Sequence, residues 1–270
     1  VAFGATVLVP LLTGLNPSLA LLGAGVGTLI FQICTKREVP IYLGSSFAFI
    51  APVIYSVQTW GMPATLGALA SASFFYYVAA GLVKWRGVGF IHRLLPPVVI
   101  GPVVMVIGLG LAQVAISMAT GKAGDQQVVP YGTALSVAAI SLLATMLTAI
   151  RAKRLLKLVP ILVGVAVGYV VSIFLGIVDF SKVTNAAWLA IPEFGKPEFN
   201  MAAILFMIPV AIAPIVEHVG GILAIGSVTG KDFTETPGLH RTLLGDGLAV
   251  NIVGLFGGPP ATTYGEVTGA

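Results

Sequence analysis

Apolar stretches of about 20 residues follow one another along almost the whole chain, separated by short polar or Gly- and Pro-containing breaks. A helix of about 20 apolar residues is long enough to cross the hydrocarbon core of a bilayer. Charged residues account for 9% of the sequence, whereas soluble domains contain about 25%. A soluble protein with a large core would not need one run of this length after another. We therefore expect an all-α polytopic membrane protein.

The breaks divide the chain into ten candidate spans. These lie near residues 1–13, 19–34, 40–57, 63–83, 97–118, 130–150, 158–178, 201–228, 238–256 and 260 onward. The first residue, Val1, already belongs to an apolar run, and the last, Ala270, belongs to another. We therefore expect a single fragment, 1–270, that runs from a truncated first span to the start of a tenth.

The basic residues alternate between the two sides of these expected spans. The even-numbered connections hold 11 of the 14, namely Lys36, Arg37, Lys84, Arg86, Arg93, Arg151, Lys153, Arg154, Lys157, Lys231 and Arg241. The odd-numbered connections hold only Lys122, Lys182 and Lys196. Loops rich in Lys and Arg remain in the cytoplasm. We therefore expect the even connections and the N-terminus on the cytoplasmic side.

Two segments do not have the pattern of plain spanning helices. Pro40 and Gly44 open the third, and a Gly-Gly-Pro-Pro run at 257–260 precedes the tenth; such clusters oppose helix formation. Both breaks continue with a hydroxyl, hydroxyl, aromatic pattern, which is Ser45-Ser46-Phe47 in one and Thr262-Thr263-Tyr264 in the other. Irregular backbone at membrane depth persists only where protein or a water-filled cavity covers it. Interrupted segments at corresponding places in two halves indicate the binding site of a secondary transporter.

Three carboxylates lie within or beside the expected spans: Glu217, Asp246 and Glu266. An ionised carboxylate at membrane depth costs at least about 2.5 to 3.5 kcal/mol, so such a residue indicates a functional site. A structural carboxylate paired with a neighbour is the alternative, above all for Asp246, which the pattern places close to a loop. Burial favours the neutral form of a carboxyl group, so any of the three could exchange a proton.

Glu217 lies in the eighth span with His218 beside it. Gly220 and Gly221 follow at i+3 and i+4 on the same helical face. They leave that face open to a cavity or to a close helix contact. His218 points about 100° away from Glu217. We interpret His218 as a hydrogen-bonded structural histidine, with proton transfer as the alternative role.

The two breaks also indicate what kind of ligand fits between them. A half-helix that begins after a break presents unpaired backbone N–H groups. Glu217 and Glu266 add hydrogen-bond acceptors, and Phe47 adds an aromatic face. A pyrimidine base carries the complementary groups, which are ring N–H donors, carbonyl acceptors and a flat ring. An amide or a small acid would satisfy some of the same groups.

No sequence motif supports an enzyme, a metal site or a cofactor. The chain has no phosphate-binding Gly-rich loop, no paired-Cys site and no His-Glu-x-x-His run. Its single cysteine, Cys34, excludes an internal disulfide. We expect no catalytic residues, no metal, no cofactor and no nucleic-acid partner, because the basic residues lie in short loops and report membrane topology.

Five stretches resemble one family, the nucleobase:cation symporters, which include the nucleobase-ascorbate transporters, and most closely its bacterial uracil and uracil/xanthine permeases. The stretches are FGATVLVP (3–10), VPIYLGSSFAFIAPV (39–53), IVEHVGG (215–221), PGLHRTLLGDGL (237–248) and TTYGE (262–266). The resemblance extends from end to end, and the GSSFAF, EHVG and TTYGE runs are its most specific part.

The resemblance implies a fold of fourteen spans in two inverted repeats of seven, divided into a core domain and a gate domain. It also implies short strands in the broken third and tenth segments, each leading into a half-helix. In this chain the core domain would comprise about 1–118 and 201–270, and the gate domain about 119–200.

The resemblance assigns roles to individual residues. Hydrogen bonds to the base fall to Glu217 and Glu266. Stacking falls to Phe47, and backbone contacts fall to Phe47 and Gly265. The expected substrate-binding residues are thus Glu217, Glu266, Phe47, Gly265 and Ser46, and the proton-coupling candidates are Glu217, Glu266, Asp246 and His218. Gly221 and Val267 depart from the family pattern, which has histidine and asparagine at these positions, so a proton role for that histidine does not carry over.

The expected function is uptake of a nucleobase, most specifically uracil, by proton symport across the bacterial inner membrane. Its partners would be the base, protons and the lipid bilayer, with a homodimer as an option. Glu266 resembles the uracil branch, because the xanthine and urate branch usually has glutamine there. A xanthine or urate permease is the first alternative. An anion transporter on the same fold is the second, which the intramembrane glutamates oppose, and a membrane-bound enzyme is the third.

Overall fold

The computed structural model describes residues 2–87, 89–90, 93, 97–123, 126–153, 156–157, 159–185, 187 and 190–263. The chain divides into two compact units. The larger unit consists of Ala2–Gly108 and the described residues from Pro192 onward, and the smaller unit is Leu109–Ile191. The division falls within the helix α5 (Pro97–Ala119).

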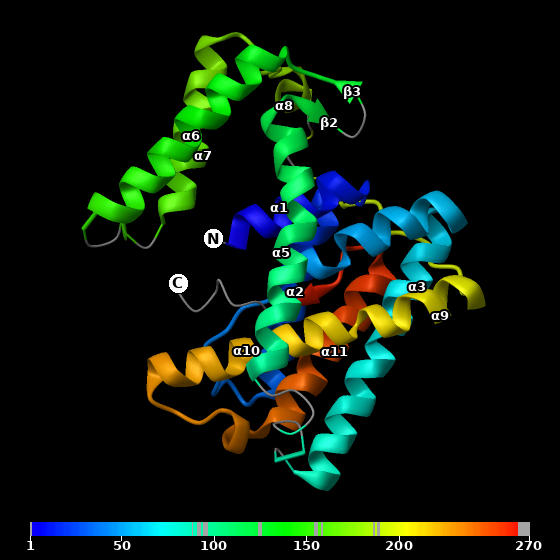
Figure 1. Ribbon diagram of the computed structural model, residues 1–270. Coiled ribbons are helices and arrows are strands. Elements are labelled where there is room, and N and C mark those ends of the chain that lie inside the picture. Colours follow the sequence, from blue (N-terminus) through cyan, green and yellow to red (C-terminus); the bar gives the residue numbers. More distant parts are fainter. Residues whose placement is uncertain are drawn as a thin grey trace. The chain divides into compact units, whose positions relative to one another are not determined.

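The larger unit is mostly helical (Figure 1). Its described helices are α1 (Ala2–Thr13), α2 (Pro17–Cys34), α3 (Ile50–Arg86), the first part of α5, α9 (Met201–Val210), α10 (Ile212–Thr229) and α11 (Leu239–Phe256). Two short strands, β1 (Gly44–Ser45) and β4 (Ala261–Thr262), a 3-10 turn, η1 (Phe47–Phe49), and a π-helical turn, η3 (Thr234–Gly238), complete it.

The helices follow the expected spans. Within the described residues, five helical stretches are long and apolar enough to cross a membrane: Pro17–Cys34, Phe47–Arg86, Gly101–Ala119, Tyr131–Arg151 and Met201–Thr229. The spans predicted at 40–57 and 63–83 correspond to two helices that follow each other directly within α3. Gly61 separates them with a non-helical φ of +82°, so the second helix begins at once without an intervening loop.

The first break is non-helical, and side chains of α2 provide its hydrogen bonds. Gln32 Nε2 donates to the carbonyl oxygens of Val39 and Ile41 at 2.9 and 2.8 Å. The backbone N–H of Leu43 donates to Thr28 Oγ1 at 2.8 Å. Buried backbone groups without partners are costly. The extended chain before β1 is therefore stable because α2 covers it, as irregular backbone in a membrane requires.

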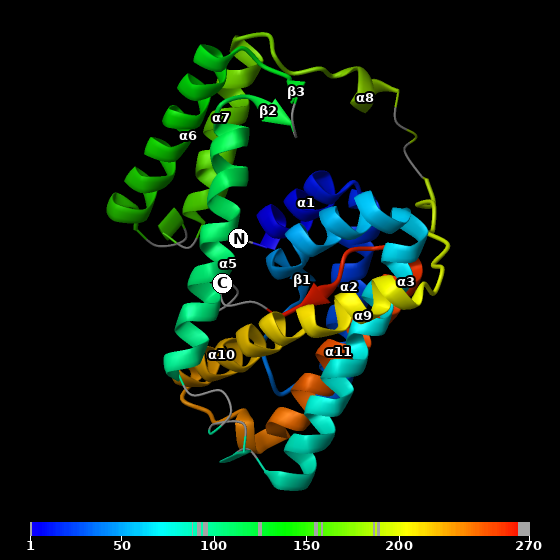
Figure 2. The same cartoon turned by 45° about the vertical axis from the view of Figure 1, so that its right-hand side comes forward.

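The two breaks lie side by side. Strand β1 pairs with β4 in antiparallel orientation, with Gly44 opposite Thr262 and Ser45 opposite Ala261. The backbone N–H of Ser46 extends the pairing by donating to the Pro260 carbonyl at 3.0 Å. Figure 2 shows β4 as the red arrow beside β1. The short strands that the family resemblance implies are therefore present.

Helix α11 packs against both α2 and α3 through small residues. A Cβ atom on Gly27 of α2 would lie 3.2 Å from the Cβ of Ala249 and 3.3 Å from that of Ala261. On the other side, Asn251 Nδ2 donates to the Ala70 carbonyl at 3.0 Å. Small side chains allow this close approach of helices. The packing brings α11 and β4 into the centre of the larger unit.

The smaller unit contains a helical hairpin, α6 (Tyr131–Arg151) and α7 (Pro160–Phe174), together with the hairpin β2 (Lys122–Ala123) and β3 (Gln126–Gln127) and the short helix α8 (Ser181–Thr184). Gly164 and Gly168 are the buried residues of α7, and Ser141 Oγ donates to the Gly164 carbonyl at 2.9 Å. The division into a core domain and a gate domain stays a prediction. The two compact units do not by themselves show which part of the protein moves during transport.

Candidate functional site

A buried polar network centred on His218 joins α10, α11 and the second break. His218 Nδ1 lies 2.7 Å from Thr263 Oγ1, and His218 Nε2 lies 2.9 Å from Thr242 Oγ1. Asp246 Oδ2 lies 3.2 Å from His218 Nδ1. All four side chains are fully buried. The network therefore holds three segments of the chain together at one point.

Asp246 anchors the second break to α11. Its Oδ1 accepts a hydrogen bond of 2.9 Å from the backbone N–H of Thr263. The sequence pattern places Asp246 close to a loop, but the structure buries it completely inside α11. The helix begins at Leu239, about two turns earlier, so Asp246 lies well away from the helix end.

The hydrogen-bond directions leave two distributions of the hydrogens on His218 and Asp246. Thr242 Oγ1 donates to the Leu239 carbonyl at 3.0 Å. A hydroxyl has a single hydrogen, so Thr242 accepts from His218, whose Nε2 then carries a hydrogen. The approach of His218 Nδ1 to Asp246 Oδ2 is favourable only if one of these atoms also carries a hydrogen. The pair is thus either an imidazolium with a carboxylate or two neutral groups.

Two aromatic side chains lie near this pair. Phe31 of α2 meets the His218 ring edge-on, with the ring centroids 6.5 Å apart. Tyr76 of α3 is fully buried, and its hydroxyl has no hydrogen-bond partner among the described residues. Asp246 and Glu217 both act electrostatically on the Tyr76 phenol group. Tyr76 therefore lies within electrostatic range of both carboxylates.

Glu217 is half-buried in α10, directly before His218. One turn further along, no described atom lies within 4 Å of the position that a Cβ on Gly221 would take. Gly221 is itself buried, so the described part of the chain leaves room beside it without exposing it.

Residues of the first break lie next to the second. Ser46 is buried, and its hydroxyl has no hydrogen-bond partner within the described part of the chain. Phe47 begins η1 and packs, half-buried, against the hydrophobic core. Gly265 and Glu266 lie outside the described residues, as do Tyr264 and Val267. The substrate and proton roles expected for all these residues stay predictions.

The sequence analysis did not identify Thr242, Thr263 or Tyr76 as site residues. Thr242 lies four residues before Asp246, and this spacing puts both on one face of α11. Tyr76 is a tyrosine within an apolar span, where a buried hydroxyl usually has a partner. These signals are weak, because each also occurs in ordinary packed helices. Among the described residues, no group of three or more His, Cys, Asp or Glu side chains could hold a metal ion.

Comparison with known proteins gives consistent results over the whole chain. The model of a family described as "Permease family" matches residues 1–270. A "Probable uracil permease" of Pasteurella multocida is 55% identical over 270 residues, which is 100% of this chain and 64% of that protein. The uracil permease of Bacillus caldolyticus is 46% identical over 274 residues, covering 99% of this chain and 62% of that protein.

A third relative, the uracil permease of Escherichia coli (strain K12), is 40% identical over 267 residues, covering 99% of this chain and 62% of that protein. The chain thus spans 62 to 64% of the length of these relatives.

Proposed function

Because the chain belongs to this permease family, the nucleobase-ascorbate transporters, we propose that it takes up a nucleobase, most specifically uracil, together with a proton. The family is one of transporters and not of enzymes. The family match and the long apolar helices together support a multi-pass membrane protein. The relatives named uracil permease support the choice of base.

One structural observation carries the proposal: the two breaks are paired with each other beside a buried acid and base. Transporters of this general type bind substrate where interrupted segments of two repeats meet. Here β1 and β4 form that meeting point, and His218 and Asp246 connect it through Thr263 to α10 and α11, which precede the second break.

The base would bind between the first break and α10. Glu217 would accept hydrogen bonds from ring N–H groups, and Phe47 would stack on the ring, as aromatic side chains do with nucleobases. The backbone N–H groups at the start of η1 would donate to a carbonyl oxygen of the base. Ser46, Gly265 and Glu266 complete the proposed set.

The proton would reside on the His218–Asp246 pair, with Glu217 and Glu266 as further candidates. Thr263 contacts both members of the pair, through its hydroxyl and its backbone N–H. A shift of the second break would therefore change the hydrogen bonds that stabilise one protonation state over the other. A ligand can move such an equilibrium only through a difference in its affinity for the two states, and a base bound at the break provides that difference.

We also propose the bacterial inner membrane as the location, with the N-terminus in the cytoplasm. The support for this orientation is the concentration of 11 of the 14 basic residues in the even-numbered connections. A homodimer is a further prediction, which light scattering of the purified protein would test.

Uptake of labelled uracil by the intact protein in proteoliposomes tests the proposal. Glu217→Gln should abolish uptake, because the base loses a charged acceptor while the side chain keeps its size. Glu193→Gln, the same change at an exposed residue of the larger unit, is the control and should leave uptake unchanged. Normal uptake by the Glu217 variant would exclude this role. Stronger competition by xanthine or urate than by uracil would favour a purine permease, and current driven by an anion gradient would favour an anion transporter.

A further inference from the structure

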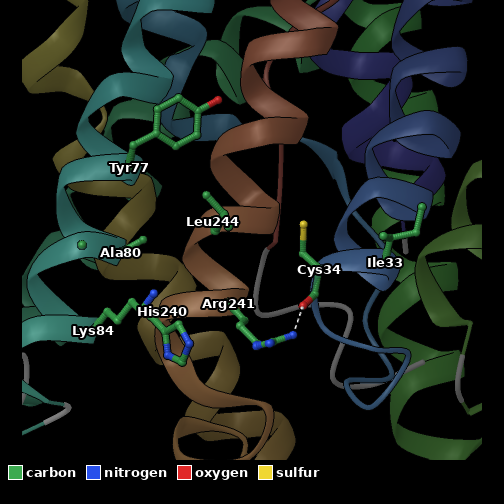
Figure 3. Close-up of a pocket in the computed structure, with 9 residues that line it drawn as sticks. Ile33, Cys34, Tyr77, Ala80, Lys84, His240, Arg241 and Leu244 are labelled. Atoms are coloured by element: carbon green, nitrogen blue, oxygen red, sulfur yellow. Dashed lines mark hydrogen bonds between the residues drawn. The ribbon is translucent and has the colours of Figure 1, made fainter.

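A pocket lies between the end of α2, the second half of α3 and the start of α11 (Figure 3). It encloses about 480 Å³, within the range of about 300 to 1,000 Å³ that is typical of ligand sites. None of its lining residues belongs to the network around His218. The pocket is therefore distinct from the proposed substrate and proton site.

Two cationic side chains and a histidine gather at one end of the pocket. Lys84 comes from α3, and His240 and Arg241 come from α11 (Figure 3). Lys84 and Arg241 both lie within electrostatic range of His240. Arg241 Nη1 donates to the Cys34 carbonyl at 3.4 Å. A guanidinium has five N–H donors, so Arg241 can bind an anion while it keeps this contact.

The charge of this pocket is unbalanced, since none of the described residues that line it is acidic. A second pocket in the same unit, of about 680 Å³, is different. Its lining combines two basic residues with three acidic ones, namely Arg37, Lys231, Glu38, Asp232 and Glu235. Opposite charges compensate one another there. Of these two pockets, the one at Lys84 has the charge that attracts an anion.

The other wall of the pocket is apolar. Ile33 and Leu244 line it and are 73% and 40% exposed. At the far end Tyr77 also lines the pocket, and its hydroxyl donates to the Gly247 carbonyl, 3.4 Å away. Exposed apolar side chains on membrane helices contact acyl chains. A free anion would gain nothing from this wall, whereas a phospholipid has both an anionic group and an acyl chain.

We propose that this pocket binds an anionic phospholipid. The headgroup phosphate contacts Lys84, Arg241 and His240, and an acyl chain lies along Ile33 and Leu244. Basic pockets between membrane helices bind anionic lipid headgroups, and the planar guanidinium matches the geometry of a phosphate. All three basic residues lie at helix ends that the distribution of Lys and Arg places at the cytoplasmic leaflet. This proposal does not depend on which solute the protein transports.

Native mass spectrometry of the purified intact protein tests the proposal. Phosphatidylglycerol and phosphatidylcholine with identical acyl chains are titrated separately, and the bound lipid is quantified. The wild type should prefer phosphatidylglycerol by at least about tenfold, and Lys84→Gln with Arg241→Gln should remove that preference. Lys84→Gln alone, a change of an exposed side chain, should weaken binding severalfold, which covers the case that the double variant does not fold.

Arg86→Gln is the matched control. Arg86 belongs to the same helix end, but its guanidinium lies over the rings of Trp85 and Phe90, 4.9 and 5.4 Å from their centroids. Its loss removes one charge outside the pocket and should change lipid binding less than about twofold. The proposal is overturned by equal binding of both lipids, by an equal loss in the control, or by unchanged binding in Lys84→Gln. Displacement of the lipid by inorganic phosphate would identify a free-anion site instead and would also overturn it.

Discussion

The backbone N–H of Thr263 donates a hydrogen bond of 2.9 Å to the carboxylate of Asp246. Thr263 follows β4 in the second break, whereas Asp246 is fully buried in α11. His218 of α10 contacts both residues through Nδ1. His218 and Asp246 thereby fix the position of the second break, where we place part of the substrate site. Protonation or deprotonation of this pair is therefore linked to the geometry of the second break.

Asp246→Ala should destabilise the protein by about 3 to 5 kcal/mol, because it leaves the Thr263 N–H and His218 without their carboxylate. Asp246→Asn retains an acceptor oxygen for Thr263 and should cost clearly less. Thermal unfolding of the purified proteins measures their stability. We expect the melting temperature to be highest for the wild type, lower for Asp246→Asn and lowest for Asp246→Ala. Equal melting temperatures for the two variants would contradict the hydrogen bond as the source of stability.

Tyr76→Phe should leave the melting temperature unchanged or raise it. The Tyr76 hydroxyl is buried without a hydrogen-bond partner among the described residues, and such a group carries a desolvation cost of about 1 to 3 kcal/mol. The neighbouring Tyr77→Phe is the control, since that hydroxyl donates to Gly247 and its loss should be neutral or slightly destabilising. A clear loss of stability in Tyr76→Phe alone would show that its hydroxyl has a partner.

Phe47→Ala should weaken base binding by about 1 to 3 kcal/mol through lost stacking. Phe47→Leu keeps the apolar contact but has no ring, so it should recover only part of the affinity. Calorimetric titration with uracil provides the dissociation constants, and the melting temperature checks folding. An unchanged constant in Phe47→Ala would remove this residue from the site.

Glu266→Gln separates two possible roles of that residue. An amide can donate as well as accept a hydrogen bond, so a substrate-binding role predicts a shift in preference between pyrimidine and purine bases. A proton-carrying role predicts normal binding and loss of uptake driven by the pH gradient. Base affinity and uptake are both measured on the one variant. Wild-type values in both assays would place the site away from the second break.

Gly254→Ala should destabilise the protein by about 1 to 3 kcal/mol, the usual cost of overpacking. The added Cβ would lie 2.8 Å from the backbone nitrogen of Ala70 and 3.0 Å from its Cα, and backbone atoms cannot move aside. Gly25→Ala in α2 is the control, because no described atom lies within 4 Å of that Cβ. It should be neutral or stabilise the helix by up to about 1 kcal/mol. Equal changes in melting temperature for Gly254→Ala and Gly25→Ala would contradict the close contact of α11 with α3.

The amino-acid sequence by itself determined the helices and their interruptions. An apolar run of bilayer length has few alternatives to a spanning helix, and the Gly and Pro residues at 257–260 and around Gly44 oppose helix wherever the chain goes. These are local constraints, so the expected spans at 130–150, 201–228 and 238–256 agree with α6, with α9 and α10, and with α11. Glu217 and Asp246 were recognisable for a similarly local reason, since a carboxylate at membrane depth is costly anywhere.

Only the tertiary structure decided which of these pieces meet. The pairing of Gly44 with Thr262 and the contact of His218 with Asp246 join residues that are far apart along the chain, and no periodicity in either segment specifies its partner. The same holds for Thr242 and Tyr76, which are ordinary helical residues until α10 packs beside Thr242 and α11 packs beside Tyr76. A buried polar group needs a hydrogen-bond partner. In this network the partner comes from a segment that is distant in the sequence, so only the complete three-dimensional arrangement determines which residues pair.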